Sequence, residues 1–176
     1  MKATGIVRRI DELGRIVIPK EIRRVLHISE GDPIEIYTED DAVVLKRYAR
    51  ARELGDAAET YCQALCGALG FSAAVADTET VLYAAGPLKK RLIGLTLSPS
   101  FLEKMRQKQA LIAQDGYLLS TQSEPVRTVA AVPIVTDGDC AGSVLLCTDD
   151  SRLSVRETEL GVLKTAALYL GKQLES

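Results

Sequence analysis

The chain has 176 residues, of which 47% are hydrophobic and 26% are charged, and its formal net charge is −2. This composition is typical of a soluble globular protein with a hydrophobic core, and it excludes a disordered or fibrous chain. The first residues, MKATGIVRRIDELG, interrupt their apolar positions with charges. We therefore expect neither a signal peptide nor a membrane span, and a cytoplasmic location.

Positive charge is concentrated near the N-terminus. Residues 1–24 carry seven basic and three acidic side chains, a local balance of +4, so the remainder of the chain carries −6. A compact basic segment on an acidic protein favours an anionic partner bound at one end, with nucleic acid the first candidate. The basic residues are Lys2, Arg8, Arg9, Arg15, Lys20, Arg23 and Arg24.

The first part of the chain predicts a hairpin followed by a short helix. Alternating apolar residues indicate strands over 4–10 and 15–18, and the turn between them needs the positive φ that Gly14 can adopt. Pro19 suits the first turn of a helix, which we expect to run to about Leu26. A second hairpin follows, because two further apolar runs flank an acidic tip at 39–41.

The short helix is predicted to have two different faces. At about 100° per residue, Ile22, Val25 and Leu26 fall on one side, which we expect to face the core. Lys20, Arg23 and Arg24 fall on the opposite side and form a cationic ridge, near which Arg8 and Arg15 can stand if the helix packs against the first hairpin. Such a ridge is more often solvated surface than a binding site, so the charge pattern alone does not decide between the two.

Residues 1–50 are too few to bury a core of their own in short strands, and they contain no cysteine for a disulfide or metal site. Association with a second copy is therefore the expected source of stability. In a two-fold dimer each basic residue appears twice, which suits a duplex with phosphates on both sides of a groove.

From Ala51 onward the pattern changes to long helices and a sheet. Apolar residues at spacings of three and four predict a helix over 53–70, and Ser154 with Glu157 predicts a capping box for a last helix. That helix carries one stripe from Leu160 to Leu174 and a second stripe through Val162, Ala166 and Tyr169, which indicates burial against the sheet and against a partner chain. The predicted strands are 72–76, 81–85, 117–121, 128–135 and 142–148, with a hairpin turn at 137–139.

Four cysteines, Cys62, Cys66, Cys140 and Cys147, are predicted to be reduced and mostly buried thiols. Cys62 and Cys66 lie four apart on the same helix, but a metal site needs further ligands, and the one histidine, His27, is far away in sequence. We expect no metal and no cofactor.

The segment GIVRRIDELGRIVIPKEIRRVLHISEGDPIEIY resembles the AbrB-type swapped-hairpin DNA-binding domain, whose pattern combines an arginine-bearing strand, an acidic hairpin tip, GRIVIP, a helix with an arginine pair and a Gly-Asp turn. The resemblance covers almost all of residues 1–50. It implies an all-β dimeric barrel of interleaved hairpins with one short helix, bound to double-stranded DNA. The implied DNA contacts are Arg8, Arg15, Arg23 and Arg24, with Lys2, Arg9 and Lys20 as helpers.

By its order of elements, the second domain, residues 51–176, resembles a GAF domain, an α+β fold in which helices flank an antiparallel sheet. GAF domains bind small ligands or dimerise through their terminal helices. The cyclic-nucleotide signature of that family is absent, so no nucleotide is implied, and a pocket between the sheet and residues 87–116 has unknown contents. The two domains together resemble the sporulation regulators of endospore-forming bacteria, which implies regulation of forespore genes and a homo-oligomer, a tetramer if the two domains dimerise with different partners. Activation and repression both stay open.

Two other functions compete with transcription regulation. AbrB-type folds also occur in antitoxins, which bind a toxin through a floppy tail, whereas here the tail is a folded domain. Some GAF domains reduce methionine sulfoxide with cysteines, but no cysteine is accompanied by an evident activating base. We therefore expect a protein that is not an enzyme.

Overall fold

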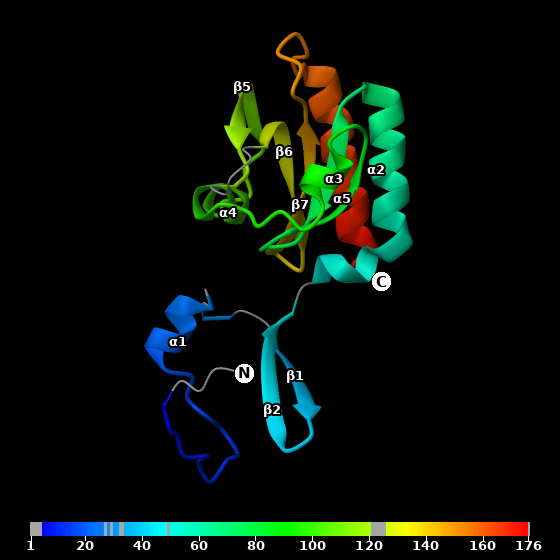
Figure 1. Cartoon of the computed structure of the whole chain (residues 1–176). Helices are drawn as coiled ribbons and strands as arrows, with labels where there is room; N and C mark the ends of the chain where they lie inside the picture. The colour runs from blue at the N-terminus through cyan, green and yellow to red at the C-terminus, as the bar shows by residue number, and fades with distance from the viewer. Residues whose placement is uncertain are drawn as a thin grey trace. The chain divides into compact units, whose positions relative to one another are not determined.

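A computed structural model divides the chain into two compact units, Met1–Tyr48 and Ala49–Ser176 (Figure 1). Each unit is described by itself. The residues that the structure describes are 5–26, 28, 30–31, 34–48, 50–120 and 126–175.

The N-terminal unit contains one helix, α1 (Lys20–Val25), and one hairpin of strands β1 (Ile34–Glu39) and β2 (Ala42–Arg47) in its described part. Pro19 stands directly before α1. The helix begins and ends close to the limits predicted for it. The strands are antiparallel with Ile36 opposite Leu45. Asp40 has a φ of 50° in the tight turn between them, a conformation that Asp tolerates better than most residues. The second predicted hairpin is therefore confirmed.

The predicted strands at 4–10 and 15–18 are wrong for the single chain, because the described residues of both segments have no strand pairing. The turn between them does form. The Asp11 amide donates to the Arg15 carbonyl at 3.0 Å, and Gly14 has the expected positive φ of 74°. A strand exists only by pairing with another, and these alternating segments find no partner strand within the described chain.

The N-terminal unit has no core of its own in the part that is described. Between residues 5 and 48, the one described residue classed as buried is Pro19. Large apolar side chains are exposed throughout the unit, and a lone two-stranded hairpin is marginally stable in water. These exposed side chains are Ile6, Val7, Ile10, Leu13, Ile16, Val17, Val25, Leu26, Ile36, Tyr37 and Val43.

The C-terminal unit is built on a five-stranded antiparallel sheet in the order β4-β3-β7-β6-β5 (Figure 1). Strands β6 and β7 form a long hairpin whose turn is Asp137–Gly138, as predicted. The strands are β3 (Ser72–Ala76), β4 (Val81–Ala85), β5 (Leu111–Leu118), β6 (Arg127–Thr136) and β7 (Asp139–Cys147).

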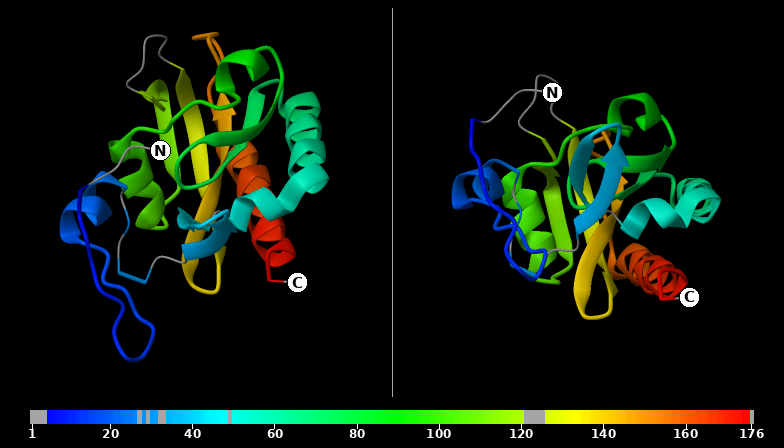
Figure 2. Two further views of the ribbon diagram at one scale, coloured as in Figure 1. Left: turned by 60° about the horizontal axis from the view of Figure 1, so that its bottom comes forward. Right: turned by 90° about the horizontal axis from the view of Figure 1, so that it is seen from below.

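Helices cover both faces of this sheet. The long helices α2 (Gly55–Leu69) and α5 (Glu157–Gln173) lie side by side on one face, and the short helices α3 (Lys89–Leu92) and α4 (Pro99–Arg106) lie on the other (Figures 1 and 2). Side chains of β7 alternate between the two sides, with Val144 in one hydrophobic core and Leu145 in the other. The antiparallel sheet flanked by helices is thus confirmed as the fold of this unit.

Several predicted boundaries in the C-terminal unit are wrong, and β7, for example, begins at Asp139 rather than at Gly142. Strand β5 begins at Leu111 rather than at Tyr117, because the polar run Gln114-Asp115-Gly116 is an irregularity within an edge strand rather than a turn before it. The cap of α5 is Arg156, not Ser154, and its amide donates to Glu159 at 2.9 Å. The helix begins later because Val155 is buried in the core immediately before the cap.

A short 3-10 helix, η1 (Arg50–Leu54), begins the C-terminal unit and is firmly attached to it. Its Ala51 and Leu54 are buried. Arg50 forms an ion pair of 2.5 Å with Asp137 in the β6–β7 turn, and Arg52 lies 3.5 Å from the buried Asp77 carboxylate at the end of β3. Two surface loops therefore hold η1 on the sheet.

Helix α5 packs so closely on β6 that a methyl group has no room at Gly171. A Cβ added there would lie 2.5 Å from the Val135 carbonyl oxygen, whereas a Cβ at Gly161 of the same helix meets nothing within 4 Å. We expect Gly171→Ala to reduce the free energy of unfolding by about 2 kcal/mol through overpacking. The matched control Gly161→Ala should stabilise by up to about 1 kcal/mol. Urea unfolding of both variants measures the difference, and equal stabilities would contradict this packing.

Candidate nucleic-acid interface

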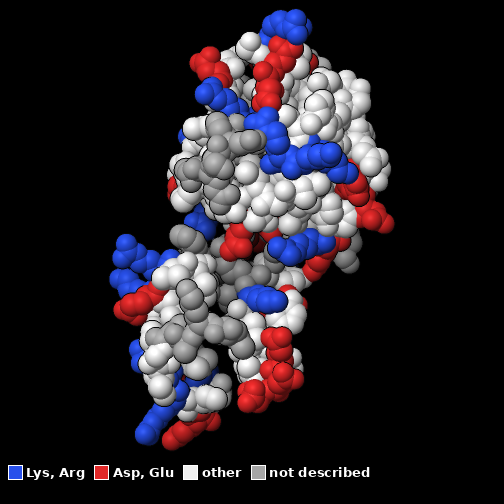
Figure 3. All heavy atoms as spheres, in the orientation of Figure 1, with Lys and Arg blue, Asp and Glu red and all other residues white. Residues whose placement is uncertain are grey.

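The predicted cationic residues are displayed on the surface of the N-terminal unit. Arg8, Arg9, Lys20 and Arg24 are exposed, and none of them has an acidic side-chain partner among the described residues. Arg15 is also exposed and forms an ion pair with Asp11. Figure 3 shows positive side chains over α1 and the loop before it, and acidic side chains at the tip of the β1–β2 hairpin. Lys2 and His27 lie outside the described residues.

The predicted division of α1 into a core face and a cationic face is wrong for the single chain. No residue of α1 is fully buried. Ile22 is half-buried, but Val25 is 74% exposed and Leu26 is 49% exposed. The helix is six residues long and, in the described unit, has no second layer to pack against. Its apolar side is therefore available to another chain.

Arg23 differs from its neighbour Arg24. Arg23 is half-buried, and its Nε is enclosed without a hydrogen-bond partner in the described structure. Arg24 is exposed. A guanidinium group has five N–H donors, and a buried one without a partner is energetically unfavourable. The single chain thus leaves at least one donor of Arg23 to be satisfied by a further group.

The loop before α1 is organised by Asp11, a residue for which the sequence reasoning predicted no role beyond the turn. Its carboxylate accepts hydrogen bonds from the amides of Leu13 and Arg15 at 3.0 and 2.8 Å, and from Arg15 Nε at 3.1 Å. An aspartate three residues before a glycine is a known turn signal, since its side chain can bond to the amides that follow. Asp11 and Gly14 have this spacing, so the sequence does contain a signal for the role of Asp11 in the turn.

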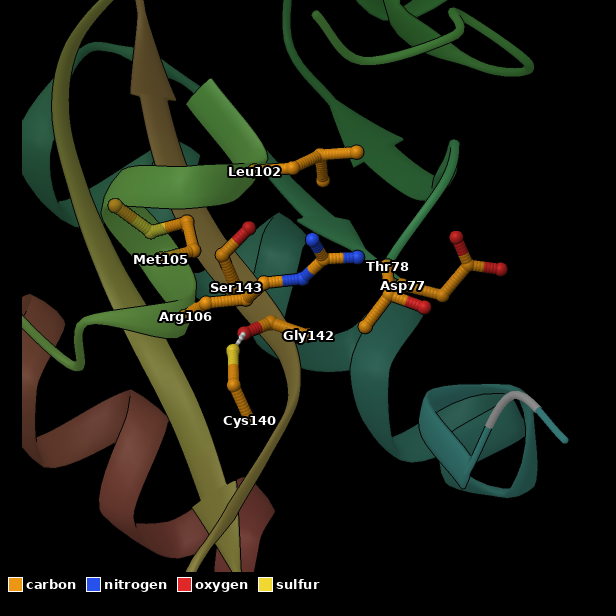
Figure 4. Close-up of a pocket in the computed structure, with 8 residues that line it drawn as sticks. All are labelled: Asp77, Thr78, Leu102, Met105, Arg106, Cys140, Gly142 and Ser143. Atoms are coloured by element: carbon orange, nitrogen blue, oxygen red, sulfur yellow. Dashed lines mark hydrogen bonds between the residues drawn. The ribbon is translucent and has the colours of Figure 1, made fainter. Parts of the chain in front are cut away.

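A small hollow lies between the sheet and α4 in the C-terminal unit, where the sequence predicted a pocket (Figure 4). Its wall includes Asp77, Thr78, Arg106, Cys140 and Ser143. Figure 4 shows Arg106 extending toward Thr78. The hollow has room for about one water molecule. It is far too small for a nucleotide.

The four cysteines are free thiols. Burial raises the pKa of both Cys62 and Cys147 to about 12. Burial also raises the pKa of Cys140, whose thiol donates to the Gly142 carbonyl at 3.3 Å. At neutral pH these three groups are protonated and therefore poor nucleophiles. Among the residues described, no group of three or more His, Cys, Asp or Glu side chains is arranged to hold a metal ion.

Two families match different parts of the chain. Residues 53–175 match the family described as "Stage V sporulation protein T C-terminal, transcription factor". The chain is also 40% identical over 179 aligned positions to stage V sporulation protein T of Bacillus subtilis, and the alignment covers 99% of both proteins. The chain belongs to the stage V sporulation protein T family.

The N-terminal unit of this family member has relatives of its own. Residues 7–53 match the family "Antidote-toxin recognition MazE, bacterial antitoxin". A stretch of 48 residues is 60% identical to the transition state regulatory protein AbrB of Bacillus subtilis and spans half of that protein. The swapped-hairpin family predicted for the N-terminal domain is thus confirmed.

The C-terminal unit has the GAF fold. It is similar to the GAF domain of a phosphoenolpyruvate-protein phosphotransferase from Coxiella burnetii, with a TM-score of 0.56 and 18% identity over 72% of this chain and 90% of that one. At this identity the likeness concerns the fold alone. In the part of the chain that the structure describes, no helix is both long enough and apolar enough to cross a membrane.

Proposed function

We propose that the protein is a homo-oligomeric transcription regulator of sporulation genes that binds double-stranded DNA through its N-terminal unit. The observation that carries this proposal is the set of exposed cations around α1 and its preceding loop, in a unit that is 60% identical to a transition state regulator. Cations without acidic partners attract phosphates and release the counterions bound to DNA. The proposed contacts are Lys2, Arg8, Arg9, Arg15, Lys20, Arg23 and Arg24.

Dimerisation of the N-terminal unit supplies the core that the single chain lacks. The exposed apolar residues of the segments 5–10 and 15–18 alternate as strands do, but neither segment forms a strand in the described structure. Interleaving with a second copy would pair these segments and bury Val25 and Leu26. The same association doubles each cation about a two-fold axis, which matches the symmetry of the DNA backbone.

A second association surface is proposed on the C-terminal unit. Leu168 is 71% exposed on α5, and Val162 and Tyr169 are also exposed on that helix. Tyr169 stacks on Tyr61 of α2, with ring centroids 5.0 Å apart. Leu168 lies on a different side of α5 from the sheet-facing Leu163, Ala167 and Leu170, and contact with a different partner chain at Leu168 would make a tetramer.

Salt dependence of DNA affinity tests the proposal. If each dimer neutralises about 8 phosphates, the logarithm of the binding constant should fall with the logarithm of salt concentration at a slope of about −7. Fluorescence anisotropy with labelled duplex DNA at several salt concentrations measures this slope. An affinity that does not change with salt would refute electrostatic DNA binding.

The cysteines are proposed to have no part in this function, in contrast to a methionine sulfoxide reductase. Serine at Cys62 or Cys147 should cost about 1–3 kcal/mol of unfolding free energy, because it buries a hydroxyl group. Serine at Cys66 or Cys140 should cost less, since both are only partly buried. DNA affinity of each folded variant should stay within a few fold of the unchanged protein. Loss of binding by a folded cysteine variant would require a redox or metal role.

An antitoxin function is less well supported, although the N-terminal family model carries that name. Antitoxins of this fold hold their toxin through a floppy tail. Here the residues that follow the match include a folded sheet with helices on both faces. A folded domain in that position favours assembly and sensing over toxin capture.

A further inference from the structure

In the loop that precedes α1, hydrogen bonds hold both the backbone and the side chain of Arg15. Asp11 accepts from the Arg15 amide at 2.8 Å and from Arg15 Nε at 3.1 Å, and its own amide donates to the Arg15 carbonyl at 3.0 Å. The turn is closed further by the Gly14 amide, which donates to the Asp11 carbonyl at 3.0 Å. One aspartate thus holds the backbone and the side chain of the same arginine.

This arrangement leaves the outer end of Arg15 available. Only Nε contacts Asp11, and neither terminal nitrogen of the Arg15 guanidinium has a hydrogen-bond partner among the described residues. The Arg15 side chain is 69% exposed. Because a guanidinium group is planar, fixing Nε restricts the direction in which the two terminal nitrogens point. Arg15 therefore presents a preorganised two-pronged donor to solvent.

The charge of the pair argues against a role as a phosphate anchor. Hydrogen bonds from the Arg15 and Leu13 amides and the Arg15 side chain keep the pKa of Asp11 below its ordinary value, so the carboxylate is ionised at neutral pH. Arg15 and Asp11 together carry no net charge, and a neutral pair releases few counterions from DNA. Arg24, by contrast, has no acidic partner in the described chain and suits a phosphate contact.

A two-pronged donor has a second well-defined target in DNA. The O6 and N7 atoms of guanine accept two parallel hydrogen bonds in the major groove, and an arginine held at the correct angle makes both. Holding the side chain in advance reduces the entropy lost when it binds. The Asp11 carboxylate beside Arg15 weakens the attraction of this arginine to DNA phosphates. It does not prevent the two directional hydrogen bonds to guanine.

We propose that Arg15 reads a guanine edge in DNA and that Asp11 is the residue that positions it, so Asp11 raises sequence specificity while lowering overall affinity. This inference rests on the proposed DNA-binding function. It assigns different tasks to two members of the cationic set, base reading to Arg15 and phosphate binding to Arg24.

The test compares Asp11→Asn with Glu12→Gln in the full-length protein. Both substitutions remove one negative charge from the same loop, but Glu12 is exposed and makes no contact with Arg15. The probes are a duplex enriched by the unchanged protein from a random-sequence pool and an unselected random duplex. Both variants should bind the random duplex more tightly. The ratio of specific to random affinity should fall about tenfold for Asp11→Asn and stay unchanged for Glu12→Gln.

A double-mutant cycle separates positioning from a general structural effect. Arg15→Lys keeps the positive charge and the backbone hydrogen bonds but removes the two-pronged donor. It should lower the specificity ratio by a similar factor, and adding Asp11→Asn to it should lower the ratio no further. Urea unfolding checks that each variant is folded.

Three results would overturn the inference, and a fourth would overturn the DNA-binding function on which it rests. Equal specificity ratios for Asp11→Asn and Glu12→Gln would overturn the positioning role, and so would binding by the unchanged protein without enrichment of any sequence. A further loss of specificity in the double variant would also overturn it. If the unchanged protein bound no duplex at all, the proposed DNA-binding function itself would fail.

Discussion

The double variant Arg23→Ala/Arg24→Ala is expected to lose detectable DNA binding at physiological salt while remaining folded. In a dimer it removes four cations, so the salt slope should become less negative by about 4. Arg24 is exposed, and the enclosed Arg23 Nε has no hydrogen-bond partner in the described structure, so neither substitution breaks a described side-chain contact. The stability of the fold should therefore change little.

A matched control for this variant is Lys90→Ala/Lys164→Ala in the C-terminal unit. Both lysines are exposed, and the pair removes the same charge from each chain. This control should keep nearly all DNA affinity, because its charges lie on a different unit. Anisotropy titrations at two salt concentrations, with circular dichroism to verify folding, measure both variants. Normal binding by the arginine variant would rule out α1 as the main DNA contact.

Removal of the C-terminal unit should weaken binding to long DNA by about 100-fold. We expect a chain that ends at Arg50 to be a folded dimer with one DNA-binding surface, whereas a full-length tetramer presents two. Linking two binding units raises the effective concentration of the second binding event, provided that both sites are reached together. On a short duplex with a single site, the two proteins should bind almost equally.

A point variant separates loss of assembly from loss of the domain. Leu168→Glu places a charge at the most exposed large apolar side chain of α5, so it should prevent tetramer formation and reproduce the affinity of the truncated chain. Ile93→Glu makes the same change at another exposed apolar position and should have little effect. Sedimentation velocity gives the mass of the assembly that each variant forms. Two results would show that the C-terminal unit does not assemble the protein in this way. One is a full-length protein that is a monomer, and the other is a truncated chain that binds long DNA as tightly as the full-length protein does.

The C-terminal fold was largely predictable because its elements are determined by local patterns. Strands 72–76 and 81–85 were identified with their observed limits, since short apolar runs are bounded by clear turns. The stripe through Leu163, Ala167 and Leu170 does face the sheet core. Strand β5 was harder, because it lies at the sheet edge and its polar central residues interrupt the alternation. An irregular edge strand has no periodicity that distinguishes it from a loop.

The N-terminal unit was harder to predict for a different reason. Its alternating residues at 5–10 and 15–18 carry the strand pattern, yet neither segment is a strand in the part of the single chain that the structure describes. The same absence explains why Val25 and Leu26, expected in a core, are exposed. For the cations, sequence reasoning identified which residues to consider but missed the hydrogen bonds of Asp11 to Arg15, which depend on the geometry of the closed loop.

The covalent connection between strand β2 and η1 is short. Strand β2 ends at Arg47 and η1 begins at Arg50, so two residues connect the paired strand to a helix held by Arg50–Asp137 and Arg52–Asp77. Such a tether spans about 10 Å at most. A connection this short keeps the two units of one chain at a high local concentration, so an N-terminal unit that occupies DNA would bring its own C-terminal unit to the same stretch of the double helix.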